Sequence, residues 1–201
     1  MNQRKDTNVD HSGQIGIALL PNQETKDKSI ALAQTIHPNL LDIGGAHYPH
    51  MTLYHARFTD VPSSVVDVML KDVAALLPLS TSFYRIATFA EKFVFWDVSM
   101  LPVLMEMHER ALDLARYFTP GKGAVGTESL KLPAEQVENV RRFGHPLMRH
   151  LCRPHITLGY DEGGHPAFKE QERIWQGGFD RVALVEIGEY GTVKKILTLG
   201  E

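Results

Sequence analysis

Cysteine is almost absent from this chain, since Cys152 is the only one among 201 residues. A single thiol excludes an internal disulfide and any zinc centre built mainly from thiolates. We therefore expect a reducing, cytoplasmic location. Long apolar runs are missing too, because the first one, IGIALL at residues 15–20, is too short for a secretory signal or a membrane span. We expect no association with a membrane.

A large excess of charge of either sign is also lacking. The chain has 21 Lys and Arg against 24 Asp and Glu, so its formal net charge is only −3. An extended cationic surface that follows a long nucleic acid is therefore not expected, and any nucleic-acid substrate should be small or held by one end. The hydrophobic fraction of 43% is enough for a core of native size. We expect residues 1–12 to form a mobile polar arm and the remainder, residues 13–201, to form one domain or two closely joined lobes, as a monomer.

Apolar periodicity and breakers predict a mixture of helices and short strands. Strands are predicted at residues 15–20, 50–54, 83–89, 92–98, 155–160, 181–189 and 192–199, and helices at about 26–37, 62–77, 101–116 and 133–144, with a last turn reaching residue 152. The glycine-containing segment 119–132 is predicted to be a mobile loop. Strands joined by tight links indicate an α+β fold with largely antiparallel sheets.

One five-residue motif occurs twice. PHMTL at residues 49–53 returns as PHITL at residues 154–158, and the two copies differ only between Met51 and Ile156. Alternation along a strand places His50, Thr52 and Tyr54 on one face, and His155 and Thr157 on one face of the second strand. A five-residue pattern repeated at four positions is not expected from strand propensity alone.

Two histidines with two hydroxyls suit acid–base chemistry on a phosphate ester. One imidazole can accept a proton from water or a sugar hydroxyl while the other protonates the departing oxygen. Thr52 and Thr157 can donate hydrogen bonds to the non-bridging oxygens, where negative charge must be held. This chemistry requires no metal and no cofactor. Six other histidines are interpreted as structural or solvated: His11, His37, His108, His145, His150 and His165.

Two aromatic residues near the motifs are candidates for stacking on a base. Tyr54 shares the predicted face of His50, and Trp96 lies on the predicted strand FVFWDV at residues 93–98. The alternative is that both pack in the core or between the lobes, and this alternative is favoured for Trp96. Tyr160 is predicted to face away from His155 unless Gly159 allows a bulge.

The paired motifs resemble those of the two-histidine phosphoesterase superfamily. This superfamily includes the 2′,5′-RNA ligase or cyclic phosphodiesterase group, and RPHITLGY at residues 153–160 is similar to its second motif. The resemblance implies a bilobal α+β fold in which two largely antiparallel sheets face each other across a central cleft, with helices outside and one motif in each lobe. It also implies metal-independent hydrolysis of 2′,3′-cyclic phosphates of nucleotides or short RNA, or of 2′,5′-linked oligonucleotides. By analogy, His50 would be the proton donor and His155 the acceptor.

Two other interpretations stay open at this point. A metal-dependent hydrolase could use His47, His50 and His155 as ligands together with Asp97. A non-catalytic module could bind a nucleotide or an RNA 3′-end with the same groups and never convert it.

Overall fold

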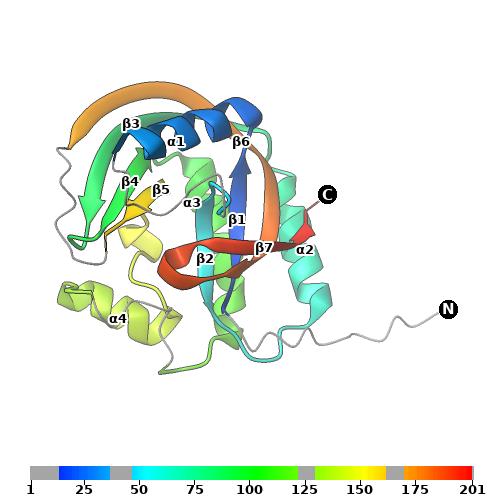
Figure 1. Ribbon diagram of the computed structural model, residues 1–201. Helices are drawn as coiled ribbons and strands as arrows, with labels where there is room; N and C mark the ends of the chain where they lie inside the picture. The colour runs from blue at the N-terminus through cyan, green and yellow to red at the C-terminus, as the bar shows by residue number, and fades with distance from the viewer. Residues whose placement is uncertain (1–13, 37–46, 122–129, 162–169, 201) are drawn as a thin grey trace.

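Antiparallel strands form the centre of the molecule and helices flank them (Figure 1). The structure is a computed structural model that describes residues 14–36, 47–121, 130–161 and 170–200. The arm predicted at residues 1–12 lies outside these ranges, as does most of the predicted loop at 119–132. The elements are β1 (Gln14–Pro21), α1 (Gln23–Ile36), β2 (Met51–Arg57), α2 (Ser63–Ala74), β3 (Leu79–Phe89), β4 (Phe93–Val98), α3 (Pro102–Ala111), η1 (Leu112–Tyr117), α4 (Ala134–Phe143), η3 (Arg149–Leu151), β5 (His155–Tyr160), β6 (Gln171–Ile187), η4 (Glu189–Gly191) and β7 (Val193–Leu199). The predicted α+β class with antiparallel pairing is confirmed.

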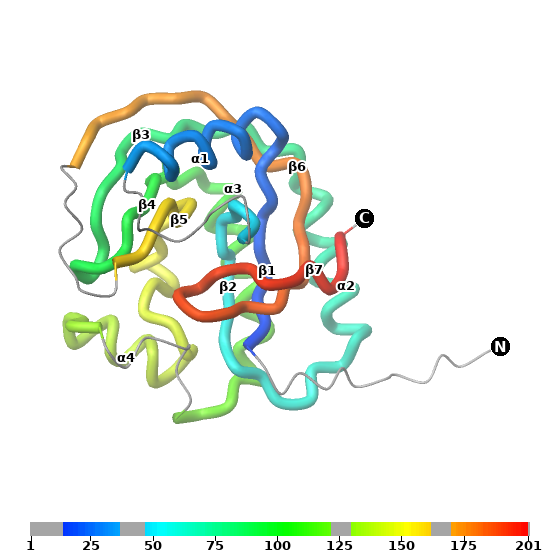
Figure 2. The backbone as a smooth tube through the Cα atoms, in the orientation of Figure 1, coloured from blue at the N-terminus to red at the C-terminus, as the bar shows by residue number. Residues whose placement is uncertain are grey.

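The strands form one continuous sheet, whereas the resemblance implied two. Their order is β2-β1-β6-β3-β4-β5, and β7 pairs with β6 beside this path. Continuity comes from β6, because its C-terminal half pairs with β1 and its N-terminal half pairs with β3. Figure 2 shows β6 as a single arc that spans both halves of the molecule. The sequence prediction started this strand only at residue 181, because the preceding residues are polar and include two adjacent glycines.

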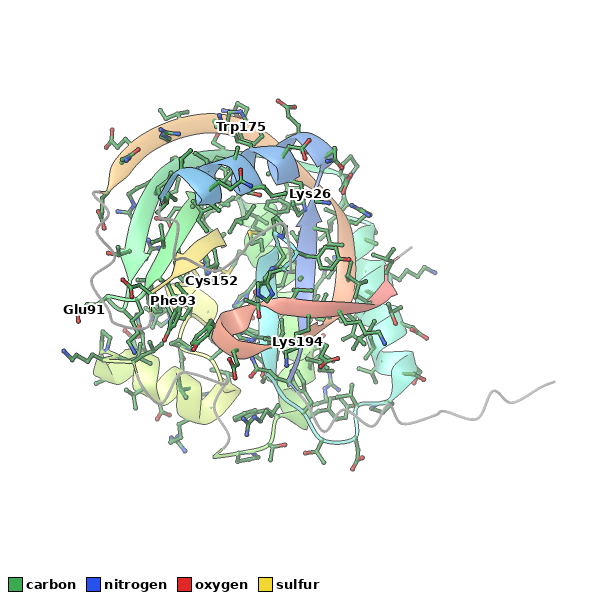
Figure 3. All side chains as sticks on the ribbon, viewed as in Figure 1. Lys26, Glu91, Phe93, Cys152, Trp175 and Lys194 are labelled. Carbon is green, nitrogen blue, oxygen red and sulfur yellow. The ribbon has the colours of Figure 1, made fainter. Side chains whose placement is uncertain are left out.

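Gly177 and Gly178 lie where β6 passes from one half of the sheet to the other. A Cβ atom on Gly177 would overlap the ring of Trp175, which is labelled on β6 in Figure 3, and the hydroxyl of Thr25. The N–H of Gly178 donates a hydrogen bond to Thr25 Oγ1 (2.9 Å). Thr25 lies in the first turn of α1, and its own N–H donates to the side chain of Asn22 (2.9 Å), which caps the helix. The small residues therefore let α1 contact β6 closely and attach the helix at this point.

The main core lies against α2 and α3. Helix α2 contacts β6 and α3, and α3 contacts β2. The residues that α2 and α3 contribute to this core are Val66, Met69, Leu70, Val73, Leu104, Met107 and Ala111. Strand β1 is buried along its whole length, because a second, smaller cluster with Ala18 and Val185 covers its other face. In the described residues no helix has both the length and the apolar character needed to cross a membrane.

The two motif strands lie at opposite ends of the strand order and still contact each other. Strand β2 is at one end and β5 is at the other, yet residues of the two strands are neighbours in space. The sheet must therefore curve round through β6. This curvature brings together two segments that are about one hundred residues apart in the sequence.

Candidate active site

Both motif strands carry a β-bulge at the same motif position. Leu53 of β2 is left without an opposite residue on β1, and Leu158 of β5 is left without one on β4. Each is the leucine of an H-x-T-L motif. A bulge re-aims the side chains that follow it, so the residue three positions after each threonine returns to the threonine's face.

The bulge in β2 turns Tyr54 to the face of the strand opposite to that of Thr52. Tyr54 lies opposite Ile17, belongs to the main core and has no exposed surface. Its hydroxyl donates to the Phe143 carbonyl (2.9 Å). The prediction that Tyr54 shares the face of His50 is therefore wrong, and this side chain has no surface on which a base could stack.

His55 lies on the face of Thr52, where strict alternation along the strand predicted Tyr54. It lines the same pocket as Thr52, and Gly16 lies directly opposite it on β1. A Cβ atom on Gly16 would be only 2.8 Å from the Cβ of His55. The missing side chain at Gly16 therefore leaves the room that the His55 position requires.

Trp96 is a core residue. It is 1% exposed, its ring centroid is 4.2 Å from that of Phe83, and it is 5.5 Å from that of Trp175. A fully buried indole offers no face to a ligand, so the stacking prediction for Trp96 is wrong. The alternative, that it packs in the core, describes its environment.

The two motif histidines are held in the same way. Nδ1 of His50 donates to the carbonyl of Tyr48 (2.8 Å), and Nδ1 of His155 donates to the carbonyl of Arg153 (2.6 Å). In both cases the acceptor lies two residues before the histidine. Such a bond fixes the tautomer, because the neutral ring then has an unprotonated Nε2 that can accept a proton.

The ring of His155 stacks on Phe95, which also contacts the guanidinium of Arg153. It stacks on Phe95, with centroids 3.5 Å apart and planes 18° from parallel, and the guanidinium of Arg153 lies over Phe95 at 5.3 Å. Asp97 is fully buried and accepts hydrogen bonds from both Arg153 and Arg85, at 2.8 to 2.9 Å. The chain of contacts from Asp97 through Arg153 therefore positions the carbonyl that orients His155.

A pocket lies where β2, β5 and the connection after α4 meet. Three of the predicted residues line it, namely Thr52, His155 and Thr157. Apart from Arg153, its other walls are apolar or neutral, and two of these residues, Phe93 and Cys152, are labelled in Figure 3. Burial raises the pKa of Cys152 to about 12, so this thiol stays protonated at neutral pH.

His50 borders a smaller cavity next to this pocket. Thr157 lines both spaces, and so do Tyr190 and Gly191 at the tip of the β6–β7 hairpin. Tyr190 has a left-handed backbone conformation (φ 59°) and stacks on Tyr160, with centroids 3.8 Å apart. The hairpin tip thus lies between the two histidine sites, and Thr157 is the motif residue common to both.

Burial lowers the pKa of four imidazoles around these cavities, those of His50, His55, His145 and His155. His155 is lowered to about 4 and His55 to about 3, and His145 is lowered well below its ordinary value. The pKa of His50 is also lowered by burial, but hydrogen bonds to the backbone carbonyls of Tyr48 and Gly191 oppose this effect. Desolvation disfavours the charged ring, so the rings are neutral at pH 7.

These pKa shifts predict a fold that loses stability in mild acid. Each ring binds a proton near pH 6.5 when unfolded and only at lower pH when folded, so the stabilisation is complete above 6.5 and is lost as the pH falls toward the folded pKa. The free energy of unfolding should fall by up to about 1.4 kcal/mol per pH unit for each ring. Urea unfolding at pH 7.5, 6.5 and 5.5 measures this, and His55→Phe should reduce the slope. A free energy of unfolding that is constant over this range would contradict the prediction.

Sequence reasoning missed His55 and His145. His145 lies between α4 and η3, was interpreted as structural, and lines the main pocket, with its ring centroid 4.4 Å from that of His55. At the second motif the sequence allows for a bulge, and there Tyr160 does lie opposite Phe93 and on the face of Thr157. The same consideration at the first motif would have identified His55. His108 matches its structural interpretation, since it is buried and bonds to Leu53 and Arg149.

The metal-dependent alternative lacks its carboxylate ligand. Asp97 was its acidic candidate, and both of its oxygens accept hydrogen bonds from arginines. Within residues 14–36, 47–121, 130–161 and 170–200, no three His, Cys, Asp or Glu side chains are grouped so that they could hold a metal ion.

The fold of this chain is similar to that of known proteins, whereas its sequence matches no known family. No family model matches the chain. Its fold is similar to TT0787 of Thermus thermophilus, with a TM-score of 0.59, 15% identity and coverage of 93% of this chain and 96% of that one. It is also similar to a structure described as a phosphoesterase, with a TM-score of 0.52, 16% identity and the same coverage.

One short sequence match falls among the curated proteins. Protein STU1 of two strains of Cryptococcus neoformans var. neoformans serotype D is 38% identical over 55 residues, which are 27% of this chain. The chain spans only 4% of the length of these relatives. The match therefore shows no shared family.

Proposed function

We propose that the protein is a metal-independent phosphodiesterase that hydrolyses 2′,3′-cyclic phosphates of nucleotides or short RNA. The proposal depends on one observation: the two H-x-T strands meet in space, and each motif histidine donates from Nδ1 to the carbonyl two residues before it. The full-length similarity of fold to a structure described as a phosphoesterase supports it. A small substrate is consistent with the net charge of −3.

In the proposed reaction, neutral His155 accepts a proton at Nε2 from a water molecule. The water oxygen forms a bond to phosphorus, the bond from phosphorus to one ribose oxygen breaks, and protonated His50 donates its Nε2 proton to that oxygen. Thr52 and Thr157 donate hydrogen bonds to the non-bridging oxygens. Thr157 borders both histidine cavities, so the phosphate is placed beside it.

Burial lowers the pKa of both proton-transfer histidines. A base must be neutral before the reaction, and burial keeps His155 neutral down to about pH 4. An acid must hold its proton; burial lowers the pKa of His50, and the carbonyls of Tyr48 and Gly191 oppose this lowering by stabilising its charged form. The assignment of His50 as donor and His155 as acceptor follows the analogy with the two-histidine phosphoesterases that the motifs resemble.

The direct test uses the four nucleoside 2′,3′-cyclic phosphates. We expect release of a nucleoside monophosphate by the purified protein, with equal rates in the presence and absence of excess EDTA. Chromatography that separates the 2′ and 3′ isomers identifies the product. Loss of the activity in EDTA would favour a metal-dependent hydrolase, and binding of nucleotides without any product would favour a non-catalytic module.

The pH dependence of kcat/KM should be a bell displaced toward acid. The rate rises as His155 loses its proton, near pH 4, and falls as His50 loses its own, below the ordinary histidine pKa of 6.5. The optimum is therefore expected between about pH 4 and 6.5. Initial rates from pH 4 to 9 at substrate concentrations well below KM measure it. A plateau that extends above pH 7.5 would contradict the prediction.

A further inference from the structure

Two pocket histidines have no part in the reaction proposed above. His55 follows the bulge of β2, and His145 follows α4, so the two rings come from separate elements. Their centroids are 4.4 Å apart with planes inclined by 59°, and both line the pocket that contains His155. Neither position is explained by packing alone, because both rings reach the pocket surface.

Hydrogen bonds at Nδ1 fix both pocket-lining rings with their proton on Nε2. The backbone N–H of Leu147 donates to Nδ1 of His145 (3.2 Å), and the side-chain amide of Gln14 donates to Nδ1 of His55. A neutral imidazole that accepts at Nδ1 carries its proton on Nε2. Neither Nε2 has a hydrogen-bond acceptor among the described residues. This arrangement is the reverse of that at His155, where Nδ1 donates to the Arg153 carbonyl and Nε2 is the acceptor.

The charges around these two donors suit an anion. Histidines and Arg153 are the titratable groups with nitrogen that line the pocket, and no Asp or Glu occurs among its described lining residues. The nearest buried carboxylate, Asp97, is bound by Arg85 and Arg153. The neighbouring imidazoles disfavour one another's charged forms, since they lower the pKa of His145 and His55 in addition to burial. A bound anion would reverse that effect.

We propose that His55 and His145 form a second phosphate-binding subsite, which takes a phosphate group of the substrate other than the one that reacts. This inference rests on the proposed function for the identity of the reacting phosphate. The preferred substrate is then a cyclic nucleotide that carries an additional phosphate, such as one at the 5′ position. The phenylalanines of the pocket, Phe89, Phe93 and Phe95, provide an apolar wall for the part between the two phosphates.

Isothermal titration calorimetry with paired product analogues tests this subsite. Adenosine 2′-monophosphate is compared with adenosine 2′,5′-bisphosphate, and adenosine 3′-monophosphate with adenosine 3′,5′-bisphosphate. We expect the additional phosphate to lower Kd by about tenfold or more, as two hydrogen bonds to a charged group would. In His55→Phe and His145→Phe the ring is kept and the donor is lost, so the gain should fall below about twofold. His150→Phe, which changes an exposed histidine outside the pocket, is the matched control.

Each outcome separates this inference from the proposed function. Equal binding of the two analogues by the unchanged protein would overturn the subsite, whatever the variants do. A gain that persists in both variants would place the second phosphate elsewhere and would also overturn it. Hydrolysis of cyclic phosphates without the expected gain leaves the proposed function standing alone. The expected gain without hydrolysis supports the subsite and refutes the enzymatic proposal.

Discussion

Replacement of His155 with alanine is expected to lower kcat for cyclic-phosphate hydrolysis by about 10²- to 10⁴-fold. The change removes the group that is proposed to accept the proton of water, and general acid–base catalysis contributes about this much. Because the ring mainly contacts Phe95 and the cavity, the protein should still fold. Single-turnover rates at saturating substrate measure the effect, and circular dichroism checks the fold.

His50→Ala is expected to lower kcat by a similar factor. In the double variant, the decrease in kcat should be smaller than the product of the two single decreases. Residues that act as a unit in one reaction are not additive. His150→Ala is a suitable control, because His150 is exposed and pairs with Glu135. Turnover by His155→Ala at the unchanged rate would refute the two-histidine mechanism.

The second large effect is expected at Asp97. Asp97→Asn should lower the free energy of unfolding by about 3 kcal/mol, because it removes the negative charge that two guanidinium groups share at a fully buried position. This value is at the low end of the range for broken buried pairs, since Arg85 and Arg153 are 39% and 23% exposed. Urea unfolding at pH 7.5 measures the change.

A matched exposed carboxylate provides the control for Asp97. Asp113 contacts Arg116 at 3.8 Å on the surface, so Asp113→Asn should change stability by less than about 1 kcal/mol. In addition, Asp97→Asn should lower kcat, because Arg153 supplies the carbonyl that orients His155. A variant as stable and as active as the unchanged protein would contradict the positioning of Arg153 by Asp97.

The repeated motif and its apolar surroundings predicted much of this molecule from sequence. The strands at residues 15–20, 83–89 and 92–98 and the helix at 62–77 correspond to β1, β3, β4 and α2. They have strong local signals, either compact apolar runs or helical spacing bounded by proline. The helix predicted at 101–116 changes to a 3-10 helix after Ala111, which apolar spacing does not reveal.

The rest depended on contacts that a single sequence does not display. The bulge of β2 that exchanges Tyr54 for His55 is a property of strand pairing, since it is visible only in the register of β2 against β1. The full length of β6 was missed because Gly177 and Gly178 look like a break, whereas they permit close approach of Trp175 and Thr25. His145 was missed because its partner, His55, is ninety residues away.

The continuous course of β6 has a consequence for how a ligand is admitted. Enzymes with two lobes often close on a substrate by rotation about a flexible linker, but here a hydrogen-bonded strand joins both halves. Rotation of one half against the other would break ladder bonds on either side of Gly177. We therefore expect the distance between the motif strands to be nearly constant with and without a ligand. The fixed distance between the motif strands would then limit the size of the ligands that can bind. Ligand uptake and release would require movement only of local parts such as the β6–β7 hairpin tip.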